Sequence, residues 1–364
     1  MAVMSLTRRQ LTALGAAAGL VPGMALAQTV RQPIVIGHRG ASGERPEHTR
    51  AAYELAIEQG ADFIEPDLVV TKDGALVARH ENNLADTTDV GARPQFAGRR
   101  TTKLVDGESV TGWFSEDFTL AELKTLVCKE RLPALRPKSA AWKTPEPILT
   151  FQEVIEIARA GSVRTARVIG IYPEMKHPAY FAGLDMAIEP KLASALRTNG
   201  YDFAAAAVWV QSFEAESLRS FRRLSRAKTV QLMSLDPAYR EMLSPSGLRE
   251  VKTYADAVGL DQGLVLDLNA EPFPADTGVV RAAHAAGLQV HSWTARQENQ
   301  FLPRTLQKGD ARRPGFAAQP GNINGLLIAL YMTRLDGVFS DFPGLAVKAR
   351  TQAMALMARP PGRR

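Results

Sequence analysis

The chain has 364 residues, of which 45% are hydrophobic and 23% are charged, and its formal net charge is +6. This composition is typical of a soluble globular protein and excludes intrinsic disorder over most of the length. The positive excess comes without a block of Lys and Arg, so nucleic-acid binding is not indicated. The only cysteine, Cys128, excludes an internal disulfide bond and a cysteine-based zinc site.

The first 27 residues have the pattern of a targeting segment. Arg8-Arg9 precedes an apolar, alanine-rich stretch, and Ala25-Leu26-Ala27 is a small-x-small site that suits a signal peptidase. The two arginines resemble a twin-arginine export signal, with an ordinary secretory signal as the alternative. We therefore expect a signal peptide over residues 1–27 and a periplasmic or secreted mature protein. No apolar run long enough to span a membrane follows in the rest of the sequence.

Eight short apolar segments are predicted as strands, and several of them end in polar residues. They are residues 34–39, 62–70, 168–176, 206–212, 229–233, 257–260, 288–293 and 337–341. Helical patterns lie between most of them, over residues 50–59, 192–198, 217–224 and 277–286. This alternation predicts a parallel sheet, most simply a (β/α)8 TIM barrel, with a doubly wound open sheet as the alternative. Both folds gather their reactive residues at the carboxyl ends of the strands.

Two stretches break the alternation. Residues 76–80 resemble a strand but follow the preceding strand too closely for a parallel crossover, and Asp73-Gly74 favours a hairpin turn. We expect these residues to run antiparallel, above the mouth of the barrel. From residue 82 to about residue 164 the strand pattern fades, which predicts an inserted cap region. A smaller irregular stretch over residues 300–324 is also expected to lie over the catalytic face.

Three carboxylates have positions that suit a metal site. Glu65 and Asp67 are two residues apart on a predicted strand, so they share a face, and neighbouring like charges repel unless a cation lies between them. Glu174 ends another predicted strand and would add a third oxygen ligand. Three carboxylates suit Ca²⁺ or Mg²⁺, and Lys176 beside them would balance an anionic ligand. Solvent-facing acids or a Glu–Lys surface pair would have the same spacing.

The first predicted strand ends in His38-Arg39-Gly40. Glycine permits a close backbone approach, arginine offers a fork for phosphate, and histidine transfers protons near neutral pH. His80 would supply a second imidazole from the predicted hairpin. Weaker candidates are His48, His177, His284 and His291. The sequence lacks the motifs of P-loop, zincin and α/β-hydrolase enzymes, so those chemistries have no support.

Several motifs together resemble those of the glycerophosphodiester phosphodiesterases, in unbroken order over roughly residues 33–350. They are His38-Arg39-Gly40-Ala41-Ser42-Gly43, Pro46-Glu47-His48-Thr49, Glu65-Pro66-Asp67, Thr71-Lys72-Asp73-Gly74, Ile171-Tyr172-Pro173-Glu174-Met175-Lys176 and Ser340-Asp341-Phe342-Pro343. The Pro-Glu-His-Thr form and the long insertion look most like the bacterial periplasmic members of the family.

The resemblance implies a (β/α)8 barrel with an inserted cap. It also implies divalent-cation-dependent, commonly Ca²⁺-dependent, hydrolysis of small-molecule glycerophosphodiesters to sn-glycerol 3-phosphate and an alcohol such as choline or ethanolamine. The residues that the family uses fall on metal ligands Glu65, Asp67 and Glu174, catalytic histidines His38 and His80, and phosphate contacts Arg39 and Lys176. We further expect Trp293, at the end of a strand, to pack on the glycerol carbons.

Two positions depart from the family pattern. Glu81 follows the second catalytic histidine where the family usually has Asp, and His177 follows Lys176 where the family has no regular histidine. The longer acid is expected to shift the hairpin or to lose a contact that orients His80. Neither departure removes one of the expected site residues.

Three other functions stay open on the sequence alone. The first is a related barrel phosphodiesterase that acts on lysophospholipids or sphingolipids. The second is a non-catalytic periplasmic protein that binds phosphodiesters, although the intact set of histidines and carboxylates argues against it. The third is a structural surface protein, which needs no such set.

Overall fold

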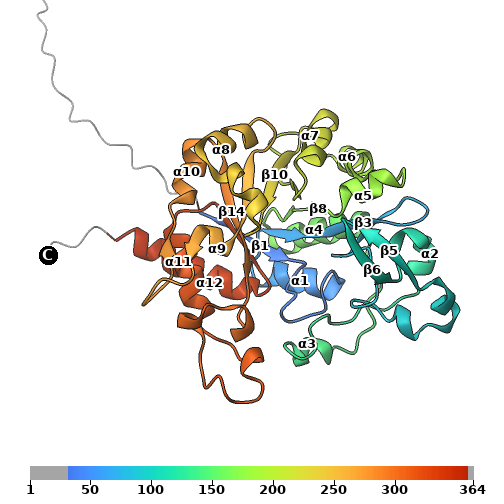
Figure 1. Ribbon diagram of the computed structural model, residues 1–364, viewed down its shortest axis with the longest axis horizontal. Coiled ribbons are helices and arrows are strands. Elements are labelled where there is room, and N and C mark those ends of the chain that lie inside the picture. The colour runs from blue at the N-terminus through green and yellow to red at the C-terminus, as the bar shows by residue number, and fades with distance from the viewer. Residues whose placement is uncertain (1–31, 360–364) are drawn as a thin grey trace, which may run out of the picture. The chain divides into compact units, whose positions relative to one another are not determined.

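The computed structural model describes residues 32–359, so the predicted signal peptide over residues 1–27 lies outside the described residues. An eleven-stranded mixed sheet is surrounded by helices in an α/β barrel-like fold (Figure 1). Among the described residues, no helix has both the length and the apolar character needed to cross a bilayer.

All eight predicted parallel strands are present, two of them in two pieces. The strands are β1 (Ile34–His38), β2 (Phe63–Glu65) and β3 (Asp67–Val70), β7 (Gly170–Ile171) and β8 (Glu174–Met175), β9 (Trp209–Ser212), β10 (Lys228–Met233), β11 (Ala257–Asp261), β14 (Gln289–Ala295) and β15 (Gly337–Ser340). Pro66 and Pro173 lie at the two interruptions, because proline has no N–H to donate to a neighbouring strand.

The strand pairings lead round the sheet and return to their start. In parallel pairings, β2 pairs with β7, β3 with β8, and β8 with β9, and the run continues through β10, β11, β14 and β15. β1 pairs with β15 on one side and β2 on the other. The sheet is therefore curled, as a barrel requires, and the doubly wound open sheet is not the fold. The carboxyl ends of its parallel strands consequently face one another around a common centre.

The longer helices follow the strands along the chain and cover the outside of the sheet (Figure 1). They are α1 (Arg50–Glu58), α4 (Phe151–Thr165), α6 (Ile188–Thr198), α7 (Ala215–Leu224), α8 (Pro245–Val251), α10 (Val279–Ala285), α11 (Ile323–Met332) and α12 (Pro343–Met357). Thr150 and Glu153 form a capping box at the start of α4. The side chain of each residue accepts a hydrogen bond from the backbone N–H of the other. The apolar faces of these helices pack into one large core against the strands.

A second, smaller core fills the inside of the curled sheet. Ile36, Tyr172, Trp209 and Phe339 are its larger buried members. The buried Tyr172 hydroxyl lies 2.6 Å from Nδ1 of His291 and so has a hydrogen-bond partner. This packed interior forms the floor beneath the ends of the strands.

The predicted antiparallel hairpin is confirmed. β4 (Leu76–Ala78) pairs antiparallel with β3, with Val69 opposite Val77, and Gly74 takes the left-handed conformation in the turn. Arg79, which follows β4, is fully buried; its guanidinium donates to carbonyl oxygens of Thr87, Glu47 and His48 and contacts Cys128 Sγ at 3.1 Å. The hairpin is thus tied to the segments on both sides of it.

Residues 82–164 hold short elements and much irregular chain before α4. They include the antiparallel hairpin β5 (Thr101–Val105) and β6 (Glu108–Gly112), the helices α2 (Leu120–Leu123) and α3 (Pro137–Ala140), and 3-10 turns at Val90–Ala92, Pro94–Arg99 and Ser115–Asp117. Figure 1 shows β5 and β6 next to β3 and α2.

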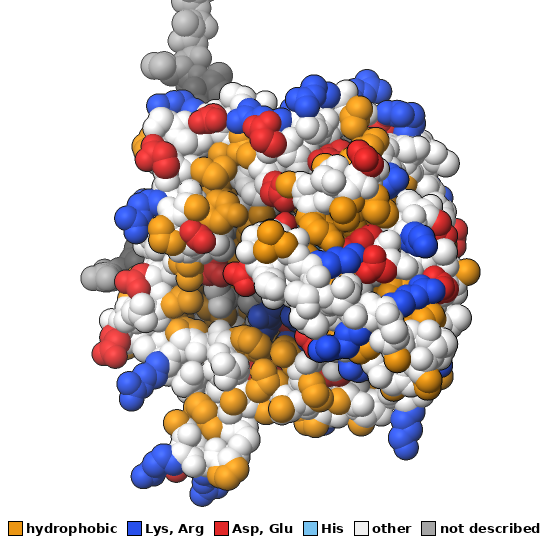
Figure 2. Space-filling view, turned by 45° about the vertical axis from the view of Figure 1, so that its right-hand side comes forward, with side chains coloured by type: hydrophobic (Ala, Val, Ile, Leu, Met, Phe, Trp, Pro, Cys, Tyr) orange, Lys and Arg blue, Asp and Glu red, His pale blue; other side chains and the backbone are white. Residues whose placement is uncertain are grey.

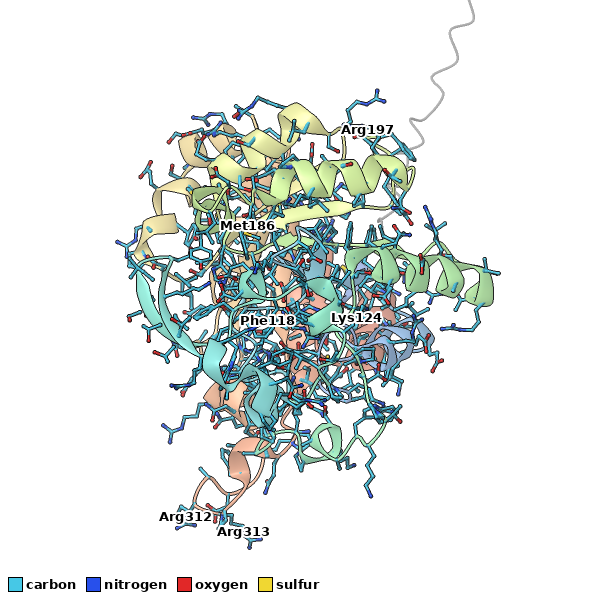
Figure 3. The ribbon with its side chains drawn as sticks, turned by 90° about the vertical axis from the view of Figure 1, so that its right-hand side faces the viewer. Phe118, Lys124, Met186, Arg197, Arg312 and Arg313 are labelled. Carbon is cyan, nitrogen blue, oxygen red and sulfur yellow. The ribbon has the colours of Figure 1, made fainter. Side chains whose placement is uncertain are left out.

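The remaining connections also hold only short elements. They contain α5 (Pro178–Gly183), α9 (Gln262–Val265), the small hairpin of β12 (Leu266–Asp267) and β13 (Ala275–Asp276), and 3-10 turns at Pro237–Tyr239, Glu241–Leu243, Asn299–Phe301, Arg304–Leu306 and Phe316–Ala318. The predicted irregular stretch over residues 300–324 is a long loop whose tip carries Arg312 and Arg313, away from the side that holds Phe118 and Lys124 (Figure 3).

Candidate active site

A cavity of about 310 Å³ lies at the carboxyl ends of the parallel strands. The face drawn in Figure 2 is hollowed near its centre, where hydrophobic and basic side chains adjoin. Seven of the eight sequence-predicted site residues line the cavity: His38, Arg39, Glu65, His80, Glu174, Lys176 and Trp293. The eighth, Asp67, lies behind Arg39, with its Oδ2 3.1 Å from Arg39 Nε.

Three buried carboxylates meet at this cavity. Glu65 ends β2, Asp67 begins β3 and Glu174 begins β8, and one oxygen from each lies within 4.8 Å of the others. Register explains the meeting, because Asp67 is opposite Glu174 in the β3–β8 pairing. Such a group of oxygen donors is the kind that binds a hard divalent cation.

The pKa shifts of the three carboxyl groups are those expected of a group that binds a cation. Burial and then repulsion by Asp67 raise the pKa of Glu65 well above its usual value. Burial is likewise the main cause that raises the pKa of Glu174 to about 7. The pKa of Asp67 is held well below its usual value, against the effect of burial, by Arg39 and a hydrogen bond from His48. Asp67 Oδ1 is buried and has no hydrogen-bond donor among the described residues.

Two further residues hold the carboxylates in place. His48 is fully buried, with Nε2 2.9 Å from Asp67 Oδ2 and Nδ1 2.8 Å from the Tyr53 hydroxyl. Gln211, at the end of β9, donates from Nε2 to Glu65 Oε1 at 3.1 Å. Partners of this kind fix the orientation of metal ligands. His48 was only a weak candidate in the sequence, so the structure places it nearer to the chemistry than predicted.

Arg39 is the buried cation that faces these acids. It adopts a left-handed backbone conformation, which lets its N–H donate to Glu65 Oε2 at 2.8 Å while its guanidinium lies beside Asp67. Glu47 Oε2 accepts from the other side of the guanidinium at 3.2 Å. The guanidinium edge is thereby fixed at the wall of the cavity, where it can meet an anion.

His38 is oriented by a chain of buried charges. Its Nδ1 lies 2.6 Å from Asp341 Oδ1, and the other oxygen of Asp341 bonds to Arg136 and Arg296. Arg136 in turn pairs with Glu298 at 2.7 Å. Burial, followed by the positive charge of Arg39, lowers the pKa of His38 to about 4. The imidazole is therefore neutral near pH 7, with Nε2 available as a base.

His80 lies across the cavity from the end of β1 and has different neighbours. Its Nε2 is 3.5 Å from Lys176 Nζ, and its Nδ1 is 2.7 Å from Glu81 Oε1. Burial, followed by Arg39 and Lys176, lowers the pKa of His80 to about 3. The longer acid at position 81 lies within ion-pair distance of the ring, and its expected effect on the hairpin or on the contact that orients His80 stays a prediction.

Trp293 also lines the cavity, as do Gln211 and Arg296 among the residues that the sequence analysis missed. The indole of Trp293 donates to the Gly259 carbonyl at 3.0 Å and packs edge-on against Phe213. Asp341, Gln211, Arg136 and Arg296 were given no role from the sequence. Asp341 and Gln211 do end predicted strands, which is a usable signal; Arg136 and Arg296 lie in irregular segments and give none.

A profile of the Glycerophosphoryl diester phosphodiesterase family matches residues 38–345. A glycerophosphodiester phosphodiesterase of Arabidopsis thaliana is 37% identical over 337 residues, which cover 87% of this chain and 85% of the relative. One from Haemophilus influenzae is 30% identical over 381 residues, with 91% of this chain and 95% of the relative covered.

Solved structures agree on the fold. A phosphodiesterase of Oleispira antarctica, determined in complex with the product sn-glycerol-3-phosphate, superposes with a TM-score of 0.56 at 23% identity. The superposition covers 87% of this chain and 96% of the other.

If His48 orients Asp67 as a ligand, His48→Asn should weaken Ca²⁺ binding by about 10- to 100-fold. Asparagine tolerates the left-handed backbone at position 48 and so limits damage to the fold. Isothermal titration calorimetry gives the affinity. His284→Asn is the control. His284 makes a similar contact, with Asp336, but this pair lies at the surface and includes none of the three site carboxylates. Equal affinities for the two variants would contradict the assigned role of His48.

Proposed function

The chain belongs to the glycerophosphoryl diester phosphodiesterase family, and from this we propose that it hydrolyses glycerophosphodiesters to sn-glycerol 3-phosphate and an alcohol with the help of a divalent cation. The observation that carries the metal dependence is the meeting of three buried carboxylates within 4.8 Å beside two histidines. The product bound to the Oleispira antarctica phosphodiesterase supports sn-glycerol 3-phosphate as the product here.

We propose Glu65, Asp67 and Glu174 as the metal ligands, and Ca²⁺ as the ion, with Mg²⁺ as the alternative. Hard cations prefer oxygen ligands, and a divalent ion would offset the repulsion that raises the pKa of Glu65 and Glu174. When bound, the ion would supply positive charge next to the phosphoryl group. Arg39 and Lys176 add further positive charge from the wall of the same cavity.

The two histidines are proposed to divide the proton transfers. His38, neutral and held through Nδ1 by Asp341, takes the proton of the nucleophile, which is water or the 2-hydroxyl of the substrate. His80 gives a proton to the departing alkoxide. Its pKa is low in the absence of substrate, and the negative charge of a phosphodiester favours the protonated form that this step needs. Trp293 offers an apolar surface for the glycerol carbons.

The finer architecture is part of the proposal. If β2 with β3 and β7 with β8 each count as one interrupted strand, the parallel strands number eight, as in a (β/α)8 TIM barrel. Residues 33–350 would form the barrel. The cap was expected over residues 82–164, and we propose the part of it before α4 as the inserted cap, because α4 itself packs with the helices outside the sheet (Figure 1). The pairing of Arg136, from this segment, with Asp341, at the end of β15, supports a cap that closes over the catalytic face.

For location, we propose export by a signal peptide over residues 1–27, of the twin-arginine type, to the periplasm or the outside of the cell. The mature chain should then begin at Gln28. Intact-mass measurement of the protein from the periplasmic fraction checks this. A chain that begins at Met1 and stays in the cytoplasm would contradict it.

Removal of divalent ions should abolish release of glycerol 3-phosphate from glycerophosphocholine, and Ca²⁺ should restore it and raise the melting temperature. Because the pKa of Glu174 is raised to about 7, its proton must leave when the ion binds, so Ca²⁺ binding should tighten as the pH rises from 6 to 8. Calorimetry at both pH values, with Glu65→Gln as the disabled variant, measures both effects.

A normal response of Glu65→Gln to Ca²⁺ would remove Glu65 from the ligand set. An enzyme fully active in chelator would end the metal proposal. If the unmodified enzyme hydrolyses lysophospholipid or sphingomyelin but not glycerophosphocholine, the protein is instead a related phosphodiesterase that acts on lipids. Tight binding of glycerophosphocholine without turnover would favour the non-catalytic binding protein.

The leaving group separates the two histidines, because a basic alkoxide needs a proton as it departs and nitrophenolate does not. His80→Ala should lose about 10²–10⁴-fold in kcat/KM on glycerophosphocholine but far less on a glycerol nitrophenyl phosphate. His38→Ala should slow both substrates. Steady-state kinetics of both variants on both substrates provide the measurement; a loss confined to glycerophosphocholine in His38→Ala would reverse the assignment.

A further inference from the structure

Four side chains from three separate segments form a chain of contacts that ends at His80. His177, the residue before α5, lies with Nε2 3.0 Å from Glu81 Oε2 and with Nδ1 2.5 Å from Asp106 Oδ2. The other oxygen of Glu81, Oε1, lies 2.7 Å from Nδ1 of His80, an ion-pair contact that lacks the alignment of a hydrogen bond. Asp106 belongs to the tight turn between β5 and β6. The chain of contacts is therefore Asp106–His177–Glu81–His80.

In this chain of contacts, the histidine and the carboxylates stabilise one another's charged forms. A histidine whose two nitrogens both face carboxylates must donate from both, so His177 is an imidazolium. Burial opposes this state, but the hydrogen bonds to Glu81 and Asp106 raise the pKa of His177 above its usual value. The pKa of Glu81 falls well below its usual value against the effect of burial, chiefly through His177 and His80. Both shifts favour the charged form of the residue concerned.

The two departures from the family sequence pattern are the two central members of this chain. Glu81, one methylene longer than aspartate, spans the gap between His80 and His177 with one oxygen for each ring. His177 takes up the oxygen that His80 does not use. A free glutamate side chain half exposed to solvent would sample several rotamers, and a charged hydrogen bond at its second oxygen restricts it to one.

Core packing does not account for the arrangement. Two cavities, of about 520 and 410 Å³, are both lined by Asp106 and His177 and flank this pair. The pair therefore crosses open space between the β5–β6 turn and the start of α5. His177 also adopts a left-handed backbone conformation, which a residue other than glycine or asparagine occupies at a cost.

We propose that His177 is a positioning residue for the reaction: it holds Glu81 so that this carboxylate orients the ring of His80, and Asp106 holds His177. The proposal rests on the proposed function, in which His80 touches the substrate. It makes the β5–β6 turn part of the catalytic apparatus, because displacement of Asp106 would release His177 and then Glu81. His177 itself touches no reacting atom.

The test is a double-mutant cycle between positions 177 and 80. His177→Asn keeps a residue that tolerates the left-handed backbone but is too short to bridge both carboxylates. It should lower kcat/KM on glycerophosphocholine by about 10-fold and on a glycerol nitrophenyl phosphate by less than about 3-fold, a fraction of the acid's full contribution. In a His80→Ala background the same substitution should have no further effect on either substrate.

Two more variants guard against a fold effect. Asp106→Asn, at an exposed turn, should show the same substrate selectivity with a smaller loss, and Glu81→Gln should match His177→Asn. His284→Asn removes a comparable histidine–aspartate pair at the surface and should leave both substrates unchanged. Melting temperature and Ca²⁺ affinity are measured for each variant and should stay near the wild-type values.

Each outcome has one meaning for this inference. Wild-type kinetics in His177→Asn, or an equal loss on both substrates that persists in the His80→Ala background, would overturn it and leave the proposed function standing. If His80→Ala alone shows no leaving-group selectivity, the acid assignment fails instead. The positioning role then still requires that His177→Asn lose its effect when His80 is absent.

Discussion

The arrangement of this site depends on one electrostatic constraint, which is that three carboxylates are buried side by side. Glu65, Asp67 and Glu174 come from adjoining strands whose register brings them together. Buried like charges are costly, and the surrounding residues are arranged to reduce this cost. Arg39 adopts a strained conformation to place both its backbone N–H and its guanidinium against the group, and Gln211 and His48 donate to it as well.

The same constraint gives the histidines their character. Burial lowers the pKa of both His38 and His80, and the cations that offset the acids add to this effect: Arg39 acts on both rings and Lys176 on His80. In the proposed function, an arriving phosphodiester would bring negative charge to the point where these cations converge. Binding of the substrate and readiness for proton transfer would then be linked through one local field.

The sequence analysis predicted the strands and the site with unequal success, for physical reasons. The strands and the shared face of Glu65 and Asp67 were predicted from local patterns, because alternation and spacing along one strand determine which side chains share a face. Glu174 was expected to join them because it lies near the end of another predicted strand, and the three acids do meet. The breaks at Pro66 and Pro173 could have been foreseen, since proline cannot complete a ladder. The predicted strands over residues 62–70 and 168–176 ran across these prolines, so the division of each into two pieces was not predicted.

Ionic contacts between residues far apart in the sequence could not be predicted. Arg136 lies 205 residues before its partner Asp341, and nothing in an irregular, proline-containing stretch indicates that one particular arginine will be buried. His48 was undervalued because its importance comes from Asp67, 19 residues away, and from Tyr53 on the following helix. The sequence pattern within one helix or strand indicates which of its residues lie side by side. It does not indicate which residues of two separate elements will contact each other.

The bond from Arg136 to Asp341 limits how such a protein can change by exchange of loops. A loop over a barrel is commonly regarded as an interchangeable part, added or replaced while the scaffold keeps its chemistry. Here the loop supplies the counter-charge for a buried aspartate of the scaffold. A loop taken from another protein and lacking that arginine would leave Asp341 with one cation fewer. Recombination between related genes should therefore preserve the protein best when the loop and the barrel are inherited together.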